Sequence, residues 1–292
     1  MFNFLRYRLL CGVFAASLLG VVIWGLYFGG GFDYSVDFTG GSQVLLRFSQ
    51  AVSPESIKTL LKDAGYTGVD TREFSNSEIC VRIADFSADN IGIGEKIKNE
   101  VQDKLKDTGN SVELLFTDSV GPGVGEYLRW SSIKAVLIAL LLMLFYIALR
   151  FKFAFAVGAV VALFHDVLVI AAYFLLTKME ISVDIVGAIL MTLGYSINDT
   201  IVIFTKIREN LVKIKDKSVE EIINLSISQT IRRTILTSAS TALVVGSLIA
   251  FGGESLRGLS ITLMLGIVFG TYSSVFIASP VMLMFYRRKK AE

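Results

Sequence analysis

A carboxyl group and a guanidinium group occur inside two apolar stretches of this chain. Asp199 lies within the apolar run 185–204, and Arg233 opens the next one. The first run is long enough to cross a bilayer core of about 30 Å. Inserting a carboxyl group at the centre of a membrane helix costs roughly 2.5–3.5 kcal/mol on insertion scales. Such a residue is therefore retained when it has a polar partner, a water-filled cavity or a function. The two residues therefore indicate ion conduction rather than a passive anchor.

Polar side chains accompany both residues. Thr192, Tyr195 and Asp199 have the spacing of one helical face, which Asn198 borders. Apolar surroundings favour the neutral form of a carboxyl, whereas a nearby guanidinium favours the carboxylate. Movement of Arg233 relative to Asp199 would then switch the carboxyl between holding and releasing a proton. The alternative is a static buried pair that fixes helix register. Hydroxyl groups of the next span, together with water molecules, could carry the proton. The candidate proton relay therefore consists of Asp199, Arg233, Asn198, Thr237 and Thr241.

A second pair of polar residues lies within the apolar stretch 153–177. For His165 and Asp166 we favour a structural hydrogen-bonded pair over a part in the relay. Asp166 shares a helical face with Gly158 and Ala162, which predicts close packing against another helix. Asp184, at a predicted helix start, is interpreted as a cap. Small residues predict further packing faces, formed by Gly187, Ala188 and Gly194 in the fourth span and by Gly266, Gly270 and Ser274 in the sixth.

The sequence predicts no cofactor and no metal site. His165 is the only histidine. Of the two cysteines, Cys11 lies in a predicted span and Cys80 lies outside the membrane, so they cannot form a disulfide. No Cys/His cluster has metal-ligand spacing. The sequence also lacks the motifs of phosphate-binding loops, zinc proteases and serine hydrolases. We therefore expect that the protein is not an enzyme.

Composition indicates a membrane protein. Hydrophobic residues make up 53% of the chain, and the mean hydropathy is +0.62, which is unusual for a soluble protein. The first apolar run, of about twenty residues, is too long for the core of a signal peptide, and no clear cleavage site follows it. We predict an α-helical membrane protein with six transmembrane helices, at about 9–30, 131–149, 153–177, 183–205, 233–252 and 258–286.

Basic residues fall on one side of these six spans. They precede the first span, follow the second, fill the segment 206–232 and form a C-terminal tail at 287–290. By the positive-inside rule, both termini and the loop 206–232 are cytoplasmic. The net charge of +2 then reflects topology and requires no nucleic-acid partner. The predicted domains are 1–30 (N-terminal tail and first helix), 31–129 (outside the membrane) and 130–292 (helices two to six).

Residues 31–129 have the polar composition of a small folded domain. The pattern predicts strands over 44–48, 69–74, 78–83 and 112–116, and helices over 54–64 and 91–105. The run 78–83 alternates apolar and polar residues like a half-buried strand, and the SNS sequence at 75–77 indicates a hairpin. The order β-α-β-β-α-β predicts a ferredoxin-like α+β domain between the first two helices.

Glycine-rich segments lie at both ends of this domain. Glycine permits positive φ angles and close approach of backbones. We favour a simple turn for the first segment, and the functional alternative is a pair of hinges that let the domain move relative to the membrane. The residues concerned are Asp37, Gly40 and Gly41 at its start and Gly121, Gly123 and Gly125 at its end.

Several motifs together resemble the SecF family, the smaller partner of SecD in the accessory complex of the bacterial Sec protein-export translocase. The resemblance covers essentially the whole chain. The matching stretches are VDFTGG at 36–41, GPGVG at 121–125, HDV at 165–167, GYSINDT at 194–200, IREN at 207–210, QTIRRT at 229–234, TS at 237–238 and GTYSS at 270–274.

The resemblance implies a relative of the resistance-nodulation-division transporters, in which SecF corresponds to one six-helix half and SecD to the other. It implies a bacterial inner membrane, a periplasmic domain at 31–129, and use of the proton-motive force (sodium in some members) to promote polypeptide export. The implied partners are a SecD-like subunit, the Sec translocon channel and an unfolded polypeptide. By position, Asp199 would be the family's intramembrane carboxylate and Arg233 its partner. Thr205 replaces an acidic residue of many members, so no role at the cytoplasmic edge is implied there.

Three other functions share part of this pattern. Half of a proton-driven small-molecule exporter has the same architecture, but such proteins carry larger external domains and a duplicated set of spans. An intramembrane aspartyl protease could use Asp166 and Asp199, yet it needs a Gly-x-Gly-Asp-like setting, and Asp199 follows the sequence SIN. A purely structural anchor would be favoured if Asp199→Asn had no effect.

Overall fold

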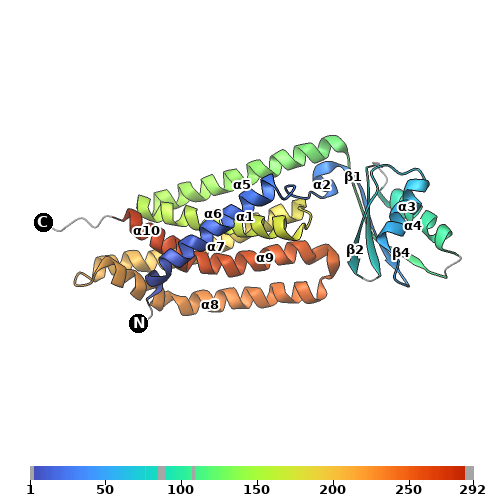
Figure 1. Ribbon diagram of the computed structural model, residues 1–292. Coiled ribbons are helices and arrows are strands. Elements are labelled where there is room, and N and C mark those ends of the chain that lie inside the picture. Colours follow the sequence, from blue (N-terminus) through green and yellow to red (C-terminus); the bar gives the residue numbers. More distant parts are fainter. Residues whose placement is uncertain (1–2, 76, 85–89, 107–108, 287–292) are drawn as a thin grey trace. The chain divides into compact units, whose positions relative to one another are not determined.

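The computed structural model describes residues 3–75, 77–84, 90–106 and 109–286 (Figure 1). The chain forms two compact units, Tyr34–Ile133 and the combination of Met1–Asp33 with Lys134–Glu292. The first unit contains a β-sheet, and the second is helical. The predicted basic tail and position 76 of the predicted hairpin lie outside the described residues.

The helical unit contains the predicted membrane spans. Six helices among the described residues are long and apolar enough to cross a membrane, which confirms the predicted number. A short 3-10 helix, η1 (Phe4–Tyr7), precedes the first of them, and a π-helical turn, η3 (Ser274–Ala278), interrupts the last. The first five spans lie in α1 (Arg8–Tyr27), α5 (Pro122–Arg150), α6 (Phe153–Thr177), α7 (Val183–Lys213) and α8 (Val219–Phe251). The sixth span is formed by α9 (Gly253–Ser273), η3 and α10 (Ser279–Phe285) together.

Helices α7 and α8 continue well past the predicted spans, so the predicted loop 206–232 is wrong in form: most of it is helical. Ser218 caps α8, because its Oγ accepts from Glu221 N while the Glu221 side chain accepts from Ser218 N. This reciprocal arrangement is a strong helix start. Asn210 Nδ2 donates to Ser226 Oγ at 2.8 Å and so joins the two helical extensions. Polar contacts of this kind leave no trace in hydropathy, which explains the error.

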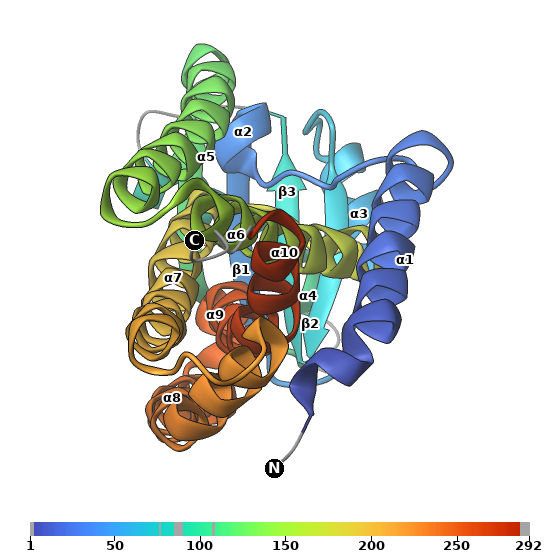
Figure 2. The same cartoon turned by 90° about the vertical axis from the view of Figure 1, so that its left-hand side faces the viewer.

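Close contacts through glycine hold the centre of this bundle together. Helices α6 and α9 lie centrally, and α1, α5 and α8 lie around them (Figure 2). A Cβ on Gly158 of α6 would stand 3.0 Å from Met282 Cβ of α10, and one on Gly270 of α9 would stand 2.8 Å from Ser196 Cβ of α7. A Cβ on Gly266 would collide with the Thr192 side chain. The packing faces predicted at Gly158 and at Gly266 and Gly270 are therefore confirmed.

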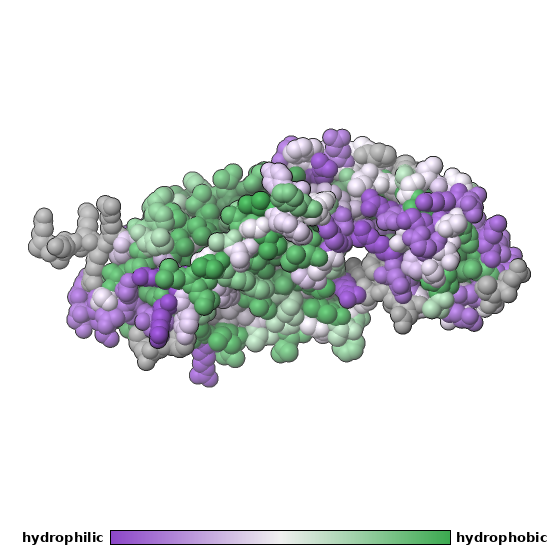
Figure 3. Space-filling view, viewed as in Figure 1, coloured by the Kyte–Doolittle hydropathy of each residue, from purple (hydrophilic) through white to green (hydrophobic). Residues whose placement is uncertain are grey.

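The outer surface of the helical unit is apolar along the middle of the helices and polar at the end that carries the N-terminus (Figure 3). Helix α5 is the clearest case, because it exposes a row of large apolar side chains to the outside. A surface of this kind fits the hydrocarbon core of a bilayer. The exposed residues of α5 include Leu137, Ile138, Leu141, Leu142 and Phe145.

The smaller unit contains an antiparallel four-stranded sheet of order β2-β3-β1-β4, against which helices α3 and α4 pack. The units β1-α3-β2 and β3-α4-β4 interleave, which confirms the predicted ferredoxin-like topology. Ile79, Val81 and Ile83 of β3 alternate into one core with Ile57 of α3 and Ile97 of α4. The elements are β1 (Gly41–Phe48), α3 (Pro54–Asp63), β2 (Asp70–Ser75), β3 (Glu78–Ile83), α4 (Asn90–Leu105) and β4 (Val112–Val120).

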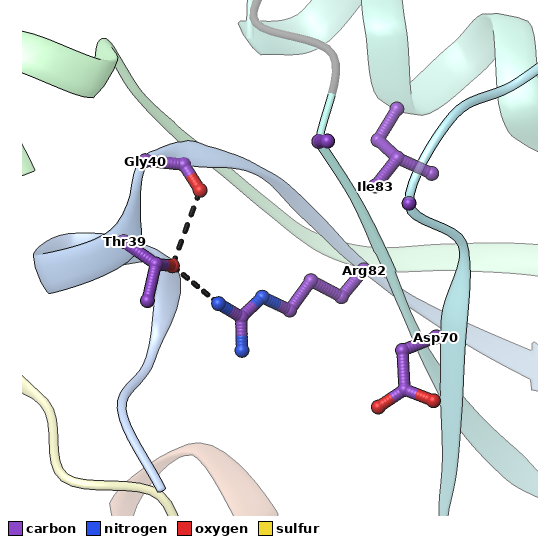
Figure 4. Close-up of a pocket in the computed structure, with 7 residues that line it drawn as sticks. Thr39, Gly40, Asp70, Arg82 and Ile83 are labelled. Carbon is purple, nitrogen blue, oxygen red and sulfur yellow. Dashed lines mark hydrogen bonds between the residues drawn. The ribbon is translucent and has the colours of Figure 1, made fainter.

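Arg82 of β3 fastens the segment that precedes β1 to the sheet (Figure 4). Its guanidinium donates to Tyr34 O at 2.9 Å and also to Thr39 Oγ1. Thr39 ends a short helix, α2 (Val36–Thr39), whose first turn contains Asp37. Gly41 follows with a φ of 109°, and a Cβ there would collide with the carbonyl oxygen of Ile83. This first glycine segment forms a tight turn within the unit, as favoured from the sequence.

The second glycine segment packs against the first. The sequence predicted a flexible element at 121–125, but Pro122 begins helix α5, as proline favours at a first helical position. A Cβ on Gly125 would stand 3.0 Å from Gly40 N. The glycines of both segments therefore lie inside one compact unit, whose boundaries fall at Tyr34 and Ile133. Their role as hinges stays a prediction.

Candidate functional site: a buried carboxyl between three helices

Asp199 lies where α7, α8 and α9 meet, and only 3% of the residue is exposed. Its Oδ2 accepts a hydrogen bond from Ser238 Oγ of α8 at 3.4 Å. Ser238 Oγ also lies 2.6 Å from Thr271 Oγ1 of α9, and Thr271 Oγ1 donates to Ile267 O at 2.8 Å. The carboxyl therefore stands at one end of a chain of hydroxyl groups that crosses from α8 to α9.

Arg233 is not in direct contact with Asp199, so the alternative of a static buried pair does not describe this structure, and movement of Arg233 stays a prediction. Arg233 is exposed, and no ion pair or hydrogen bond joins it to Asp199 in the described part of the chain. Thr234 and Ser238 occupy the inward face of α8. Arg233 precedes Ser238 by five residues, about 140° around a helix, so it points away from that face.

The other predicted relay residues are spread over two environments. Thr241 Oγ1 accepts from Tyr195 OH at 3.3 Å, so this part of α8 contacts α7. Thr237 is exposed, and its hydroxyl donates to backbone carbonyls of its own helix, as at 3.1 Å to Arg233 O. Asn198 is exposed on α7. The structure thus brings Tyr195 and Thr241 together but leaves Asn198 and Thr237 on the outside of this chain.

A second buried carboxyl, that of Asp166, lies on the neighbouring helix α6. His165 Nδ1 is 3.3 Å from Asp166 Oδ1, which confirms the predicted hydrogen-bonded pair. Asp166 Oδ2 also accepts from Ser196 Oγ of α7 at 2.6 Å. Ser196 and Asp199 are separated by one helical turn, so α7 contributes to both carboxyl sites. The structure places Asp166 within hydrogen-bonding reach of the helix that carries Asp199.

Sequence reasoning did not single out the hydroxyl partners Ser196, Ser238 and Thr271 as site residues. Ser238 belongs to the matching stretch TS at 237–238, but the rotation of the helix that turns its side chain inward could not be predicted from the sequence. Asp184 was interpreted as a cap, and the cap of α7 is instead Ser182, whose side chain accepts from Ile185 N. Among the described residues, no group of three His, Cys, Asp or Glu side chains could hold a metal ion.

One face of α7 has no close neighbour within the described chain. The sequence predicted helix packing at Gly187 and Gly194, yet nothing lies within 4 Å of a Cβ built on either residue. That prediction is wrong for these two glycines within the described residues, whereas Ala188, the third member of the predicted face, is buried. Met191 and Asn198 are exposed on the same face. Arg233 is exposed on the neighbouring helix α8. This set, which we call the open α7–α8 face, is Gly187, Met191, Gly194, Asn198 and Arg233.

These features define a six-helix membrane protein with a ferredoxin-like domain between its first two spans and a buried carboxyl in its fourth. Comparison with known proteins places it further. The family model for the C-terminal part of the protein export membrane proteins SecD and SecF matches residues 100–288, and the model for the SecD/SecF GG motif matches residues 28–52. The latter segment contains Gly40 and Gly41, the glycines of the turn described above.

Curated relatives resolve which of the two proteins this chain resembles. The protein translocase subunit SecF of Helicobacter pylori is 36% identical over 97% of this chain and 86% of its own length. The SecF subunit of Vibrio alginolyticus is 38% identical over 85% of this chain and 78% of its own length. The chain belongs to the SecF family of protein translocase subunits.

A solved structure has the same fold. The crystal structure of SecDF, a translocon-associated membrane protein from Thermus thermophilus, matches 97% of this chain with a TM-score of 0.85 and 32% identity. A second SecDF structure, in the super-membrane-facing form, matches with a TM-score of 0.68. This chain spans 38% of the length of the solved SecDF chain.

Proposed function

We propose that this chain is the accessory subunit that couples the proton-motive force to polypeptide export through the Sec translocase, acting beside a SecD-like subunit. The observation that carries the proposal is the carboxyl of Asp199, buried inside a transmembrane helix and joined to hydroxyl groups of two neighbouring helices. Intramembrane carboxyls with polar partners commonly mark ion pathways. We propose no covalent chemistry and no cofactor for this function.

The hydroxyl chain beside Asp199 has two possible directions of donation. When Asp199 is ionised, the hydroxyl of Ser238 donates a hydrogen bond to the Asp199 carboxylate, which is the hydrogen bond described above. When Asp199 is protonated, it can donate a hydrogen bond to Ser238, and Ser238 can then donate to Thr271. The hydroxyl of Thr271 itself donates to the backbone carbonyl of Ile267. One proton at Asp199 thereby reorients a contact between α8 and α9. This is how a protonation event would become a movement of helices.

Arg233 would enter as the mobile charge of this cycle. A guanidinium that approaches a carboxyl favours the ionised form of that carboxyl. The outward position of Arg233 in this structure would then correspond to the state of the cycle in which Arg233 and Asp199 are not in contact. Thr234, one turn before Ser238, has a buried hydroxyl with no hydrogen-bond partner among the described residues. Water bonded to Thr234 would extend the pathway from Ser238 toward the predicted cytoplasmic end. A charge crossing the membrane potential supplies roughly 2.3 kcal/mol per 100 mV.

The open α7–α8 face supports the presence of a partner subunit. Asn198 and Arg233 are exposed there, although polar and charged side chains facing lipid are costly. Gly187 and Gly194 leave room for another helix to approach closely. A SecD-like half that covers this face would bury the two polar side chains beside Asp199. The polypeptide substrate and the translocon channel are the further partners of this proposal.

The orientation proposed is that of a bacterial inner-membrane protein with cytoplasmic termini and a periplasmic domain at 31–129. It rests on the positive-inside distribution of Lys and Arg. The helical extensions of α7 and α8, joined by Asn210 and Ser226 and rich in charge, would lie on the cytoplasmic side with the N-terminus. Hinge motion of the domain about the glycine segments belongs to the same proposal.

The test is Asp199→Asn in proteoliposomes that contain the translocase, a SecD-like subunit and an imposed proton gradient. The substitution keeps size and hydrogen bonding but removes titration, so gradient-dependent export should be lost while insertion and assembly persist. Asp184→Asn is the matched control, because Asp184 is an exposed carboxyl on the same helix. Normal gradient-dependent export by the Asp199 variant would overturn the proposal.

A further inference from the structure

Three cations converge on a group of aromatic rings at the end of the helical unit that faces the viewer in Figure 2. Arg150 ends α5, Lys152 precedes α6 and Arg208 lies near the end of α7. The rings, which we call the aromatic platform, pack at centroid distances of 5.1 to 6.3 Å. They are Phe151, Phe155, Phe204 and Tyr286.

The platform and the helix ends fix the cations in place. The guanidinium carbons of Arg150 and Arg208 lie 5.5 and 5.1 Å from the ring centre of Phe151. The ammonium of Lys152 lies 6.0 Å from the ring centre of Tyr286. Arg208 Nη1 also donates to the carbonyl oxygen of Arg150 at 3.2 Å. Contacts of cations with aromatic faces are favourable and restrict long side chains, so the three charges form a defined site.

No carboxylate neutralises this cluster within the described residues. Other basic residues near the same helix ends are paired: Lys206 and Lys213 contact Glu209 at 3.1 and 2.6 Å. Arg150, Lys152 and Arg208 take part in no such ion pair in the described part of the chain. The charge of the cluster is thus available to an external anion. Guanidinium groups are well suited to bind phosphate oxygens in pairs.

The neighbours of the cluster are apolar and face outward. Leu149 is 73% exposed and Phe153 is 74% exposed, and they flank Arg150 and Lys152 in the sequence. A free phosphate ion would use the cations but not these side chains. A phospholipid would use both, because its headgroup would reach the cations while its acyl chains lie along the exposed apolar surface of α5 and α6.

We propose that Arg150, Lys152 and Arg208 form a binding site for the headgroup of an anionic phospholipid, with the acyl chains against Leu149 and Phe153. Basic pockets between transmembrane helices at a membrane surface suit such headgroups. The site is separate from the buried carboxyl of Asp199 and does not depend on the proposed proton coupling. It would anchor the ends of α5, α6 and α7 to the lipid of one leaflet.

The experiment counts lipids bound to the full-length protein by native mass spectrometry. Protein in a neutral detergent is titrated with phosphatidylglycerol or phosphatidylcholine. We expect one phosphatidylglycerol to bind in preference to phosphatidylcholine, and Arg208→Gln to weaken it roughly fivefold, as loss of one cation at a membrane surface predicts. Lys213→Gln is the matched control, since Lys213 lies on the same helix and is already paired with Glu209. Equal losses in the two variants would overturn the site.

Two further arms separate the alternatives. Lys152→Gln removes an exposed cation that makes no cap hydrogen bond to α6, so it keeps the test available if Arg208→Gln fails to fold. Arg208→Lys retains charge but loses the planar fork, and unchanged binding would show a diffuse charge effect instead of a built site. Glycerol phosphate at equal concentration should displace little phosphatidylglycerol. Full displacement would mean that the site takes free phosphates, against the proposal.

Discussion

Gly125 lies against the backbone of Gly40, so that a Cβ on Gly125 would stand 3.0 Å from Gly40 N and 3.0 Å from Phe38 C. These two glycines come from segments far apart in the sequence, one before β1 and one at the start of α5. Their contact closes the root of the ferredoxin-like unit, where the chain enters and leaves it. A side chain at Gly125 would force the first turn of α5 away from the turn that follows α2.

We expect Gly125→Ala to loosen this root and Gly123→Ala to leave it intact. Gly125→Ala introduces a clash with backbone atoms and should cost about 1–3 kcal/mol, as overpacking does. Gly123 has nothing within 4 Å, and Ala in place of Gly in a helix should stabilise by up to ~1 kcal/mol. Hydrogen exchange of the full-length protein, followed in peptides from β1 and β4, measures the difference. Equal protection in both variants would contradict the contact.

We expect Gly194→Leu to prevent association with a SecD-like subunit without unfolding this chain. A leucine on the open α7–α8 face would block a close helix contact, and co-purified partner should fall by roughly tenfold, equivalent to ~1.4 kcal/mol. Gly20→Leu on α1 is the matched control, because nothing lies within 4 Å of that glycine either. Partner recovery that is unchanged in the Gly194 variant would place the subunit interface elsewhere.

Arg233→Lys should impair gradient-dependent export, because a compact ammonium cannot reproduce a planar five-donor group. If Arg233 and Asp199 serve one step, the double variant Arg233→Ala with Asp199→Asn should be no worse than the poorer single variant. Export rates in proteoliposomes with an imposed gradient give the comparison. Losses that add instead would assign the two residues to separate steps.

Asp70 makes the stability of the smaller unit depend on pH. Partial burial acts to raise the pKa of Asp70, but the hydrogen bond and charge of Lys58 at 3.1 Å, with the backbone N–H of Thr71 and the charge of Arg72, outweigh it and hold the pKa below the usual value. Because the pKa is lower in the folded state, the stabilisation is full above the unfolded-state pKa of about 3.9. It is lost as the pH falls through the folded-state value.

Asp70→Asn should therefore lower the free energy of unfolding at neutral pH by less than ~1 kcal/mol, since both partners are partly exposed. It should also flatten the dependence of stability on pH below about 4. Hydrogen exchange in β2 and β3 of the full-length protein, measured across this range, checks both effects. Asp63→Asn, at an exposed position of α3, should leave the pH dependence unchanged, and a matching change there would rule out the Lys58 contact as its origin.

The sequence was sufficient for features that depend on local pattern. Six apolar runs predicted six membrane helices, and the alternation of Ile79, Val81 and Ile83 predicted a strand with one buried face. Features set by tertiary packing were not accessible. The rotation of α8, which turns Ser238 toward Asp199 and Arg233 away from it, depends on how three helices fit together. The π-helical turn after Ser273 is likewise invisible in hydropathy.

Arg82 reaches the entry segment of the smaller unit from β3, a strand that pairs with β1 on one side and β2 on the other. Tension applied to the chain at Tyr34 would thus pass directly to the middle of the sheet. An edge strand can be peeled from its single neighbour one hydrogen bond at a time, whereas displacing β3 requires two ladders to shear together. The entry segment is therefore joined to a central strand of the sheet, whereas the chain leaves the unit through β4, an edge strand.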